Sequence, residues 1–400
     1  MKPIVLLVVF LSQVSWGILP LGQPKAQAPV EILEQDVEFL FNDWLQFTVH
    51  FESSQGLQEG FVFYQFSGSD RAWVYEGEFS QDQILQVRVE LNEDNQPAPF
   101  TYLEYWFRFA SDFGDIYESE RYTLYYDDNR YPWQILQNSP FTIYWHQGDM
   151  AFAQAILAAA HQGITRSQQL LPLPDLAPVV LRVYANAEDV QLIAQQAGFS
   201  WQAGHTHPQA GLILLSLPPG PQQSLEIQRQ VPHEIAHLML YESLGAAYFR
   251  LPAWLNEGVA SNVEIYSDPN RTELLQLANA GGTLIPFFSL CKAFPQDSAS
   301  ARLAYAQSAS FVRYLFEKYK SVGFSLLVDA YAQGDDCNNA PLADFGKDLI
   351  KLEAEWREQT FASVGGAFAW FSAVPWQPIL LSAGIALALY GLLRITKTRR

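Results

Sequence analysis

Two histidines four residues apart are the feature of this sequence best suited to chemistry. His233 and His237 stand in the segment HEIAH, with Glu234 beside the first of them. On a helix, positions four apart share one face, so both imidazoles can reach one metal ion. Glu234 then points to the side of that ion, where a carboxylate can act as a general base. The pattern predicts two zinc ligands and a base for the activation of water.

An acidic residue further along the chain can complete the ligand set. Glu257 lies in AWLNEGVASNVE, which is expected to run as a helix after Pro252. Catalytic zinc takes three protein ligands and leaves one position open, and His233, His237 and Glu257 would supply those three. Glu264, seven residues beyond Glu257 on the same helical face, can accept a hydrogen bond from a ligand histidine. The alternative for Glu264 is a solvated acid.

The helix that carries the two histidines has its own sequence signals. Ser224 is a suitable N-cap, apolar residues follow at helical spacing, and Gly245 can end the helix. Pro232 removes one helix hydrogen bond and can kink the helix just before His233. The alternative is a buried helix in which both histidines are incidental, and the downstream Glu257 favours the metal site over it.

The two segments together resemble those of the gluzincin metallopeptidases. HEIAH followed by WLNEGVASNVE is similar to the zinc-binding segments of that family, and the second segment closely resembles that of the zinc aminopeptidase branch. The layout of the chain is similar to that of bacterial membrane-anchored proteins with a peptidase MA-like domain. The resemblance implies one Zn²⁺ per chain, held by His233, His237 and Glu257, with Glu234 as general base. It also implies a thermolysin-like domain.

Peptide hydrolysis builds up an oxyanion that needs a hydrogen-bond donor. In the gluzincin family a tyrosine or a histidine supplies it. The segment ARLAYAQSASFVRYLFEKY resembles the later family helix, which makes Tyr305 the candidate, with Tyr314 behind it. The alternative is that these two, among 19 tyrosines, only pack. The Gly-x-Met-Glu-Asn segment that binds the free amino terminus in the aminopeptidase branch is absent, which leaves endo- and exo-cleavage open.

Two further pairs of residues could do chemistry. His205 and His207 lie two apart in AGHTHPQAG, where such a pair can bind metal, but the flanking glycines and proline favour a plain loop. Cys291 and Cys337 are the only cysteines, and they form either one disulfide or two buried thiols. The sequence contains no P-loop, no Gly-x-Ser-x-Gly elbow and no Cys-x-x-Cys motif.

The elements that must position these residues divide the chain into two parts. Residues 29–134 contain short aromatic and β-branched segments separated by turns, which predicts an antiparallel β-sandwich. Residues 135–365 alternate strands with helices and then continue as helices, which predicts an α/β start and a helical second half in a gluzincin-like domain. The whole is expected to be α+β. The β domain shows no catalytic cluster, so we expect it to bind an unknown partner or to act as a spacer.

Both ends of the sequence carry apolar segments. Residues 1–28 resemble a signal peptide, with an uncleaved anchor as the alternative. Residues 374–393 are uncharged and bordered by aromatic residues, and the basic tail 394–400 follows. This pattern predicts one transmembrane helix with a cytoplasmic C-terminus rather than a buried core helix. The bulk of the chain is then expected at the cell membrane, outside the cytoplasm.

Composition narrows the class of protein. The formal net charge is −18 and 49% of the residues are hydrophobic, so the chain can build a packed core but lacks the cationic excess of a nucleic-acid binder. The sequence predicts a zinc metallopeptidase that hydrolyses peptide or protein substrates. The alternatives are a non-catalytic cell-surface binding protein that uses a peptidase-like scaffold, and a hydrolase of another bond. The presence of the base Glu234 favours the enzyme.

Overall fold

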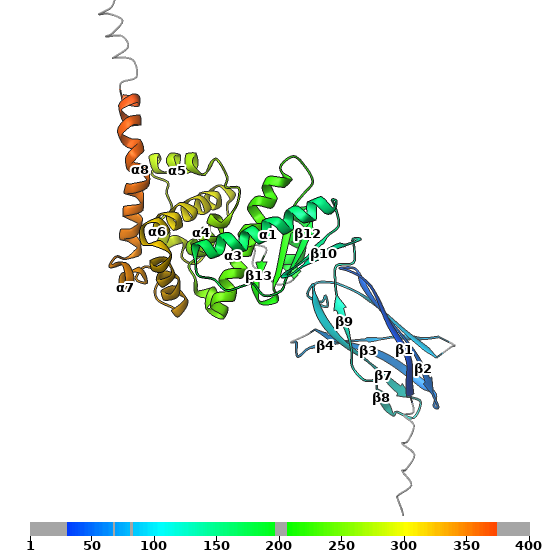
Figure 1. Cartoon of the computed structure of the whole chain (residues 1–400). Helices are drawn as coiled ribbons and strands as arrows, with labels where there is room; N and C mark the ends of the chain where they lie inside the picture. Colours follow the sequence, from blue (N-terminus) through cyan, green and yellow to red (C-terminus); the bar gives the residue numbers. More distant parts are fainter. Residues whose placement is uncertain (1–29, 67–68, 81–82, 197–205, 374–400) are drawn as a thin grey trace, which may run out of the picture. The chain divides into compact units, whose positions relative to one another are not determined.

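The computed structural model describes residues 30–66, 69–80, 83–196 and 206–373, and the chain divides into two compact units (Figure 1). The division falls between Arg130 and Tyr131. The predicted signal peptide, residues 1–28, lies outside the described residues.

The first unit consists of two antiparallel sheets. One has the order β1-β2-β6-β5, and the other has the order β4-β3-β7-β8, with β9 also paired to β7. The strands are β1 Val30–Leu40, β2 Trp44–Ser53, β3 Leu57–Phe66, β4 Ala72–Glu76, β5 Glu78–Phe79, β6 Ile84–Glu90, β7 Thr101–Ser111, β8 Ile116–Glu118 and β9 Tyr122–Tyr126.

Aromatic side chains join the two sheets of the first unit. Every second residue of β2 is buried, which is the pattern of a strand with one face on a core. The ring of Phe47 in β2 lies 5.3 Å from that of Tyr105 in β7, and the ring of Phe51 lies 4.9 Å from that of Phe109. The antiparallel N-terminal sheets expected from the sequence are therefore present.

The second unit begins with a five-stranded sheet in the order β10-β11-β12-β14-β13. Its strands are β10 Gln134–Asn138, β11 Phe141–Trp145, β12 Val179–Tyr184, β13 Thr206–His207 and β14 Leu212–Ser216. The three middle strands run parallel, and β10 and β13 pair antiparallel at the two edges. Nearly all of β12 and β14 is buried, because parallel strands are covered on both faces.

Helices make up the rest of the second unit. They are α1 Met150–Leu170, α2 Ala187–Gln196, α3 Gln223–Leu244, α4 Ala253–Val263, α5 Arg271–Ala280, α6 Ser298–Gln333, α7 Pro341–Phe345 and α8 Leu349–Ala373, with short 3₁₀ helices η2 Pro208–Ala210, η3 Gly245–Arg250 and η4 Phe287–Leu290. Helices α1 and α3 lie side by side (Figure 1). Ile156 of α1 and Ile235 of α3 share one core with Ile143 of the sheet. The helical C-terminal region of the prediction is present.

Helix α3 differs from its prediction at its start. It begins at Gln223, after Gln222, and no side chain caps it, whereas Ser224 was the expected N-cap. The helix runs through Pro232. It ends at Gly245, as predicted, where φ is 55° and a residue without a Cβ is favoured.

Helix α4 is held by a second, aromatic core. Trp254 of α4 contacts Phe287 and Phe311, and both of these rings contact Trp356 of α8. At Gly258 a Cβ would lie 2.5 Å from Val312 of α6 and 2.7 Å from the Ser308 carbonyl oxygen, so glycine permits the close approach of α4 to α6. This packing fixes the helix that carries Glu257.

A disulfide joins Cys291 and Cys337 beside this core. The backbone carbonyl of Cys291 accepts a hydrogen bond from the backbone N–H of Ala253, the first residue of α4. The hydroxyl of Tyr331 donates to the backbone carbonyl of Cys337. Of the two states that the sequence left open for the cysteines, the structure has the disulfide.

The predicted transmembrane helix is not supported, and the fold and localisation predictions are corrected on this point. Across the residues that the structure describes, no helix combines the length and apolarity needed to cross a bilayer. Helix α8, which leads to the predicted span, has charged residues in its first turns and buries Leu352 and Trp356 in the core of the unit, as an amphipathic helix does. The predicted span 374–393 and tail 394–400 lie outside the described residues. Neither single-pass membrane localisation nor a membrane partner through this helix is therefore supported.

Candidate metal centre

Two helices in succession bring three potential ligands together. Helix α3 carries His233 and His237 one turn apart, and α4 carries Glu257. One ligand atom of each residue lies within 4.8 Å of the others, and no other such group of His, Cys, Asp or Glu occurs among the described residues. The structure thus assembles the three residues that the sequence singled out as metal ligands.

The geometry of these three side chains fits a bound metal ion. The Nε2 atoms of His233 and His237 lie 3.2 and 3.6 Å from Oε2 of Glu257. All three side chains are largely buried, and Nε2 of His237 has no hydrogen-bond partner within the described part of the chain. A buried imidazole nitrogen without a partner is costly. A cation bound between the two histidines and the glutamate would satisfy it.

The charges of the group also favour a cation. Burial alone would lower the pKa of His233, but its hydrogen bonds with Glu257 and Glu264 outweigh burial and raise the pKa to about 10. Burial would raise the pKa of Glu257, but His237 and His233 beside it lower the pKa to about 2. The carboxylate of Glu257 therefore attracts positive charge, which a proton on His233 supplies. A divalent ion that binds here has to displace that proton.

The ring of His233 is oriented by a buried acid. Its Nδ1 lies 3.3 Å from Oε1 of Glu264, and Arg271 donates to both oxygens of that carboxylate at 2.8 and 2.7 Å. Arg166 of α1 donates to the backbone carbonyls of Val263 and Glu264. Glu264 is 3% exposed, so it is not a solvated acid. Hydrogen bonding at Nδ1 leaves Nε2 of His233 for the ligand group.

The ring of His237 is oriented by two residues that sequence analysis missed. Its Nδ1 lies 3.1 Å from Oδ1 of Asn256 and 3.2 Å from the hydroxyl of Tyr248. Asn256 Nδ2 donates to the same hydroxyl at 2.9 Å, which turns the amide oxygen toward the imidazole. Hydrogen on Nδ1, facing the amide oxygen, leaves Nε2 as the atom that His237 offers to a metal ion. Asn256 could have been suspected from the sequence because it directly precedes Glu257. Nothing in the sequence indicated a role for Tyr248.

Glu234 has a different set of neighbours from the ligands. It is 5% exposed and does not belong to the ligand group. Its Oε2 accepts a hydrogen bond of 2.5 Å from Oγ1 of Thr206 in β13. The negative charge of Glu234 helps to raise the pKa of both His233 and Tyr305, so the carboxylate lies near the centre without belonging to the ligand group. Sequence analysis missed Thr206, because the segment HTH drew attention only through its histidines.

Of the two tyrosine candidates, only Tyr305 lies at the centre. Its ring is 6.3 Å from that of His233. Burial and the negative charge of nearby glutamates, first among them Glu257, raise the pKa of Tyr305 well above its usual range, so the hydroxyl keeps its proton and can donate it in a hydrogen bond. Tyr314 is engaged elsewhere, because its hydroxyl donates to Glu355 of α8 at 3.1 Å.

His207 does not belong to the metal group found among the described residues. Nδ1 of His207 accepts a hydrogen bond from the backbone N–H of Ala210 at 3.2 Å and so caps η2. Burial lowers the pKa of His207. His205 lies outside the described residues.

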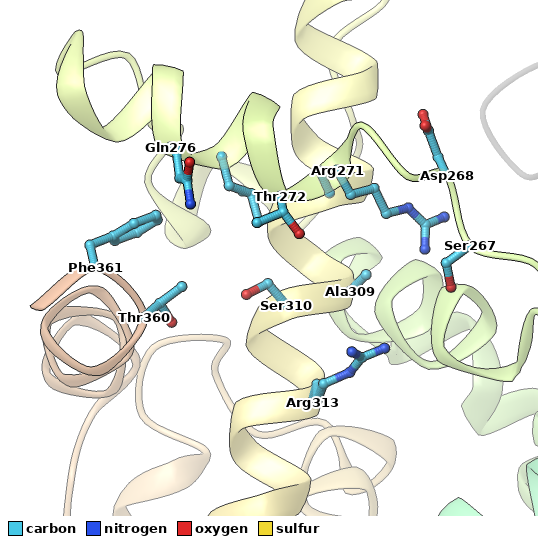
Figure 2. A pocket seen from close by; sticks show the side chains of 12 residues that line it. Ser267, Asp268, Arg271, Thr272, Gln276, Ala309, Ser310, Arg313, Thr360 and Phe361 are labelled. Carbon is cyan, nitrogen blue, oxygen red and sulfur yellow. The ribbon is translucent and has the colours of Figure 1, made fainter. Parts of the chain in front are cut away.

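A pocket of about 240 Å³ between α5, α6 and α8 borders the residues that support His233 (Figure 2). Its lining contains none of the potential ligands. Arg271 and Arg313 extend toward Ser267 at one side of the pocket, and Thr360 and Phe361 of α8 close the other side. The pocket and the metal centre share Arg271, which also binds Glu264.

The sequence and its site define a class of protein. The Peptidase MA superfamily model matches residues 159–362, just over half of the chain. The chain therefore belongs to the Peptidase MA superfamily, as the resemblance to peptidase MA-like proteins predicted. The matched range includes α3, α4 and α6, and with them every residue of the candidate centre. Proteins of this superfamily are typically metal-dependent, and the His-His-Glu group could hold the metal.

Individual relatives add little to this assignment. No curated protein matches the sequence. A solved structure titled "Myokine structure" is 9% identical, with a TM-score of 0.21, and the match covers 25% of this chain and 98% of that one. A β-1,3-glucan binding domain of carbohydrate-binding module family 56 is 17% identical, with a TM-score of 0.16 and coverages of 23% and 95%. A purple acid phosphatase from yellow lupin (Lupinus luteus) seeds is 11% identical, with a TM-score of 0.22 and coverages of 47% and 35%. Likenesses at these TM-scores carry no conclusion about this chain.

Proposed function

We propose that this chain is a zinc-dependent peptidase of the gluzincin type. His233, His237 and Glu257 would hold one Zn²⁺, with Glu234 as the general base. The observation that carries the proposal is the buried ligand group, in which three ligand atoms lie within 4.8 Å and Nε2 of His237 lacks a partner among the described residues. Two imidazoles and one carboxylate form a known ligand set of catalytic zinc, which keeps a fourth position open.

The residues around the ligand group have the chemistry that peptide hydrolysis requires. Zinc bound there would act as a Lewis acid that activates water and polarises the scissile carbonyl. Glu234 accepts the proton of the attacking water and returns it to the leaving amine. The hydroxyl of Tyr305 donates a hydrogen bond to the carbonyl oxygen as negative charge develops there. Glu264, Asn256 and Tyr248 keep the two imidazoles in the ligand tautomer.

Metal-dependent proteolysis is the direct test of this function. The full chain, loaded with zinc, should cleave an unstructured protein such as casein. A chelator should abolish the cleavage and added zinc should restore it. The side chains of the proposed site supply a base and a hydrogen-bond donor, but the Lewis acid that activates water would come from the metal. The measurement is the rate of casein cleavage together with the zinc content of each sample. If the zinc-loaded chain leaves casein and unstructured peptides intact, the non-catalytic scaffold becomes the better interpretation.

Removing the hydroxyl of Tyr305 should slow turnover without affecting zinc binding. Phenylalanine keeps the ring contacts with His233 and Phe294. Loss of one donor to an oxyanion lowers kcat by about 100-fold. Steady-state kinetics of Tyr305→Phe should show this loss in kcat with KM nearly unchanged. Tyr314→Phe is the matched control, and an equal loss in both variants would contradict a specific role for Tyr305.

A further inference from the structure

The carboxylate of Glu234 is held by a residue outside both metal-binding helices. Oγ1 of Thr206 lies 2.5 Å from Oε2 of Glu234 and 3.5 Å from the backbone carbonyl oxygen of the same residue. Thr206 is 8% exposed and Glu234 is 5% exposed, so bulk water does not easily replace the hydroxyl. In the described part of the chain, the Glu234 carboxylate has no other hydrogen-bond partner.

The sheet, not a helix, sets the position of this hydroxyl. Thr206 pairs with Ile213 of β14, so the edge strand β13 is fixed to the interior of the five-stranded sheet. The buried side chain of Thr206 meets α3, whereas its neighbour His207 caps η2. Pairing with β14 therefore places this hydroxyl next to α3.

A fixed hydroxyl solves a positional problem for a catalytic glutamate. The side chain of a glutamate has several rotatable bonds, and a general base works only within hydrogen-bond reach of the proton that it takes. A hydrogen bond to Oε2 from a residue that is paired with the sheet restricts the rotation of the carboxylate. It leaves the second oxygen, Oε1, available for the proton.

We propose that Thr206 is the positioning residue of the general base, because its hydroxyl holds Oε2 of Glu234 and directs Oε1 to the proton that is transferred. The catalytic consequence rests on the proposed peptidase function, whereas the hydrogen bond itself can be tested without catalysis.

Two substitutions distinguish the effect of the Thr206 hydroxyl from the effect of the side chain's shape. Thr206→Val removes the hydroxyl and keeps the β-branched side chain, while Thr206→Ser keeps the hydroxyl and loses a methyl group. In the zinc-loaded chain, the valine variant should lose about 10- to 100-fold in kcat, the range expected for one hydrogen bond to a charged group. KM and zinc content should not change, and the serine variant should recover most of the activity. Thr142→Val in β11 makes the same change in the same sheet, far from Glu234 in sequence, and serves as the control.

A double-mutant cycle in the metal-free chain measures the contact itself. Thr206→Val should raise the unfolding equilibrium constant of the second unit by about tenfold when Glu234 is present. The same substitution should have a much smaller effect in a Glu234→Ala background, because the partner is gone. This coupling does not depend on zinc, on substrate or on turnover.

The outcomes distinguish this proposal from the proposed function. Coupling in the cycle together with a lower kcat at constant KM supports the positioning role. Absence of coupling overturns it, and so does a rise in KM at constant kcat, which would place Thr206 against the substrate. An equal loss in the serine and valine variants would assign the effect to packing and overturn the role as well. If the wild-type chain binds zinc but hydrolyses nothing, the proposed function fails, and the cycle alone decides whether Thr206 holds Glu234.

Discussion

Replacing Glu234 with glutamine should abolish peptide hydrolysis while zinc stays bound. The substitution removes the group that takes the proton from water, and general-base catalysis contributes about 100- to 10,000-fold to a rate. We therefore expect kcat to fall by about 1,000-fold or more. The ligand group does not include Glu234, so the zinc content should remain near that of the wild type. The amide oxygen of glutamine can still accept the hydrogen bond from Thr206, which keeps the local packing.

The control for this variant is the same chemical change at an exposed position of α3. Glu242→Gln removes one negative charge from the same helix, where the side chain is exposed. Its kcat and zinc content should match those of the wild type. A Glu234→Gln variant that lost zinc would show that Glu234 is a ligand rather than the base. A variant that kept full activity would show that another residue moves the proton.

The local part of the site was predictable because it depends on helix geometry alone. His233 and His237 are four positions apart, and any helix puts such a pair on one face. Gly245 marked the end of that helix for an equally local reason, since glycine adopts the positive φ that stops α3. The meeting of Glu257 with the two histidines is not local. It was expected because catalytic zinc takes three protein ligands and because the two segments resemble those of the gluzincins, and in the structure α4 packs against α3 and α6.

The supporting residues were not predictable, because they meet the site only through the tertiary fold. Thr206 lies 28 positions before Glu234 and comes from a strand of only two residues. Arg271 reaches Glu264 from the first turn of α5, and Tyr248 reaches His237 from a 3₁₀ helix. Single tyrosines, threonines and arginines carry no signal in a sequence, since most of them pack or face solvent. For the same reason the sequence left two interpretations of Glu264, a partner of a ligand histidine or a solvated acid. Only its burial in the structure distinguishes them.

The prediction of a transmembrane helix rested on hydropathy and composition alone. Residues 374–393 are long and uncharged enough for a span by composition. The helix that the structure describes next to them, α8, belongs to the second unit, where Trp356 packs with Phe287 and Phe311.

Replacing Glu257 with alanine should remove most of the affinity for zinc and leave the fold intact. Oε2 of Glu257 is the atom common to both histidines, at 3.2 and 3.6 Å from their Nε2 atoms. Loss of a residue that only supports a ligand costs about 10- to 100-fold in metal affinity, so loss of the ligand itself should cost at least about 100-fold. Helix α4 should keep its place, because Trp254 anchors it in the aromatic core and Gly258 permits its contact with α6.

Two measurements separate the loss of a ligand from misfolding. They are the zinc content after equilibration in a zinc buffer and the thermal unfolding of the metal-free chain. The wild type should hold about one zinc per chain by the count of one three-ligand site, and Glu257→Ala should hold much less at the same free zinc. Glu242→Ala, the same change at an exposed position of α3, should bind zinc like the wild type. Undiminished affinity in Glu257→Ala would show that Glu257 is not a ligand and would contradict the proposed gluzincin-type centre. No zinc in the wild type after reconstitution would remove the metal centre altogether, and the antiparallel sheets of the first unit would then be the place to look for a binding function.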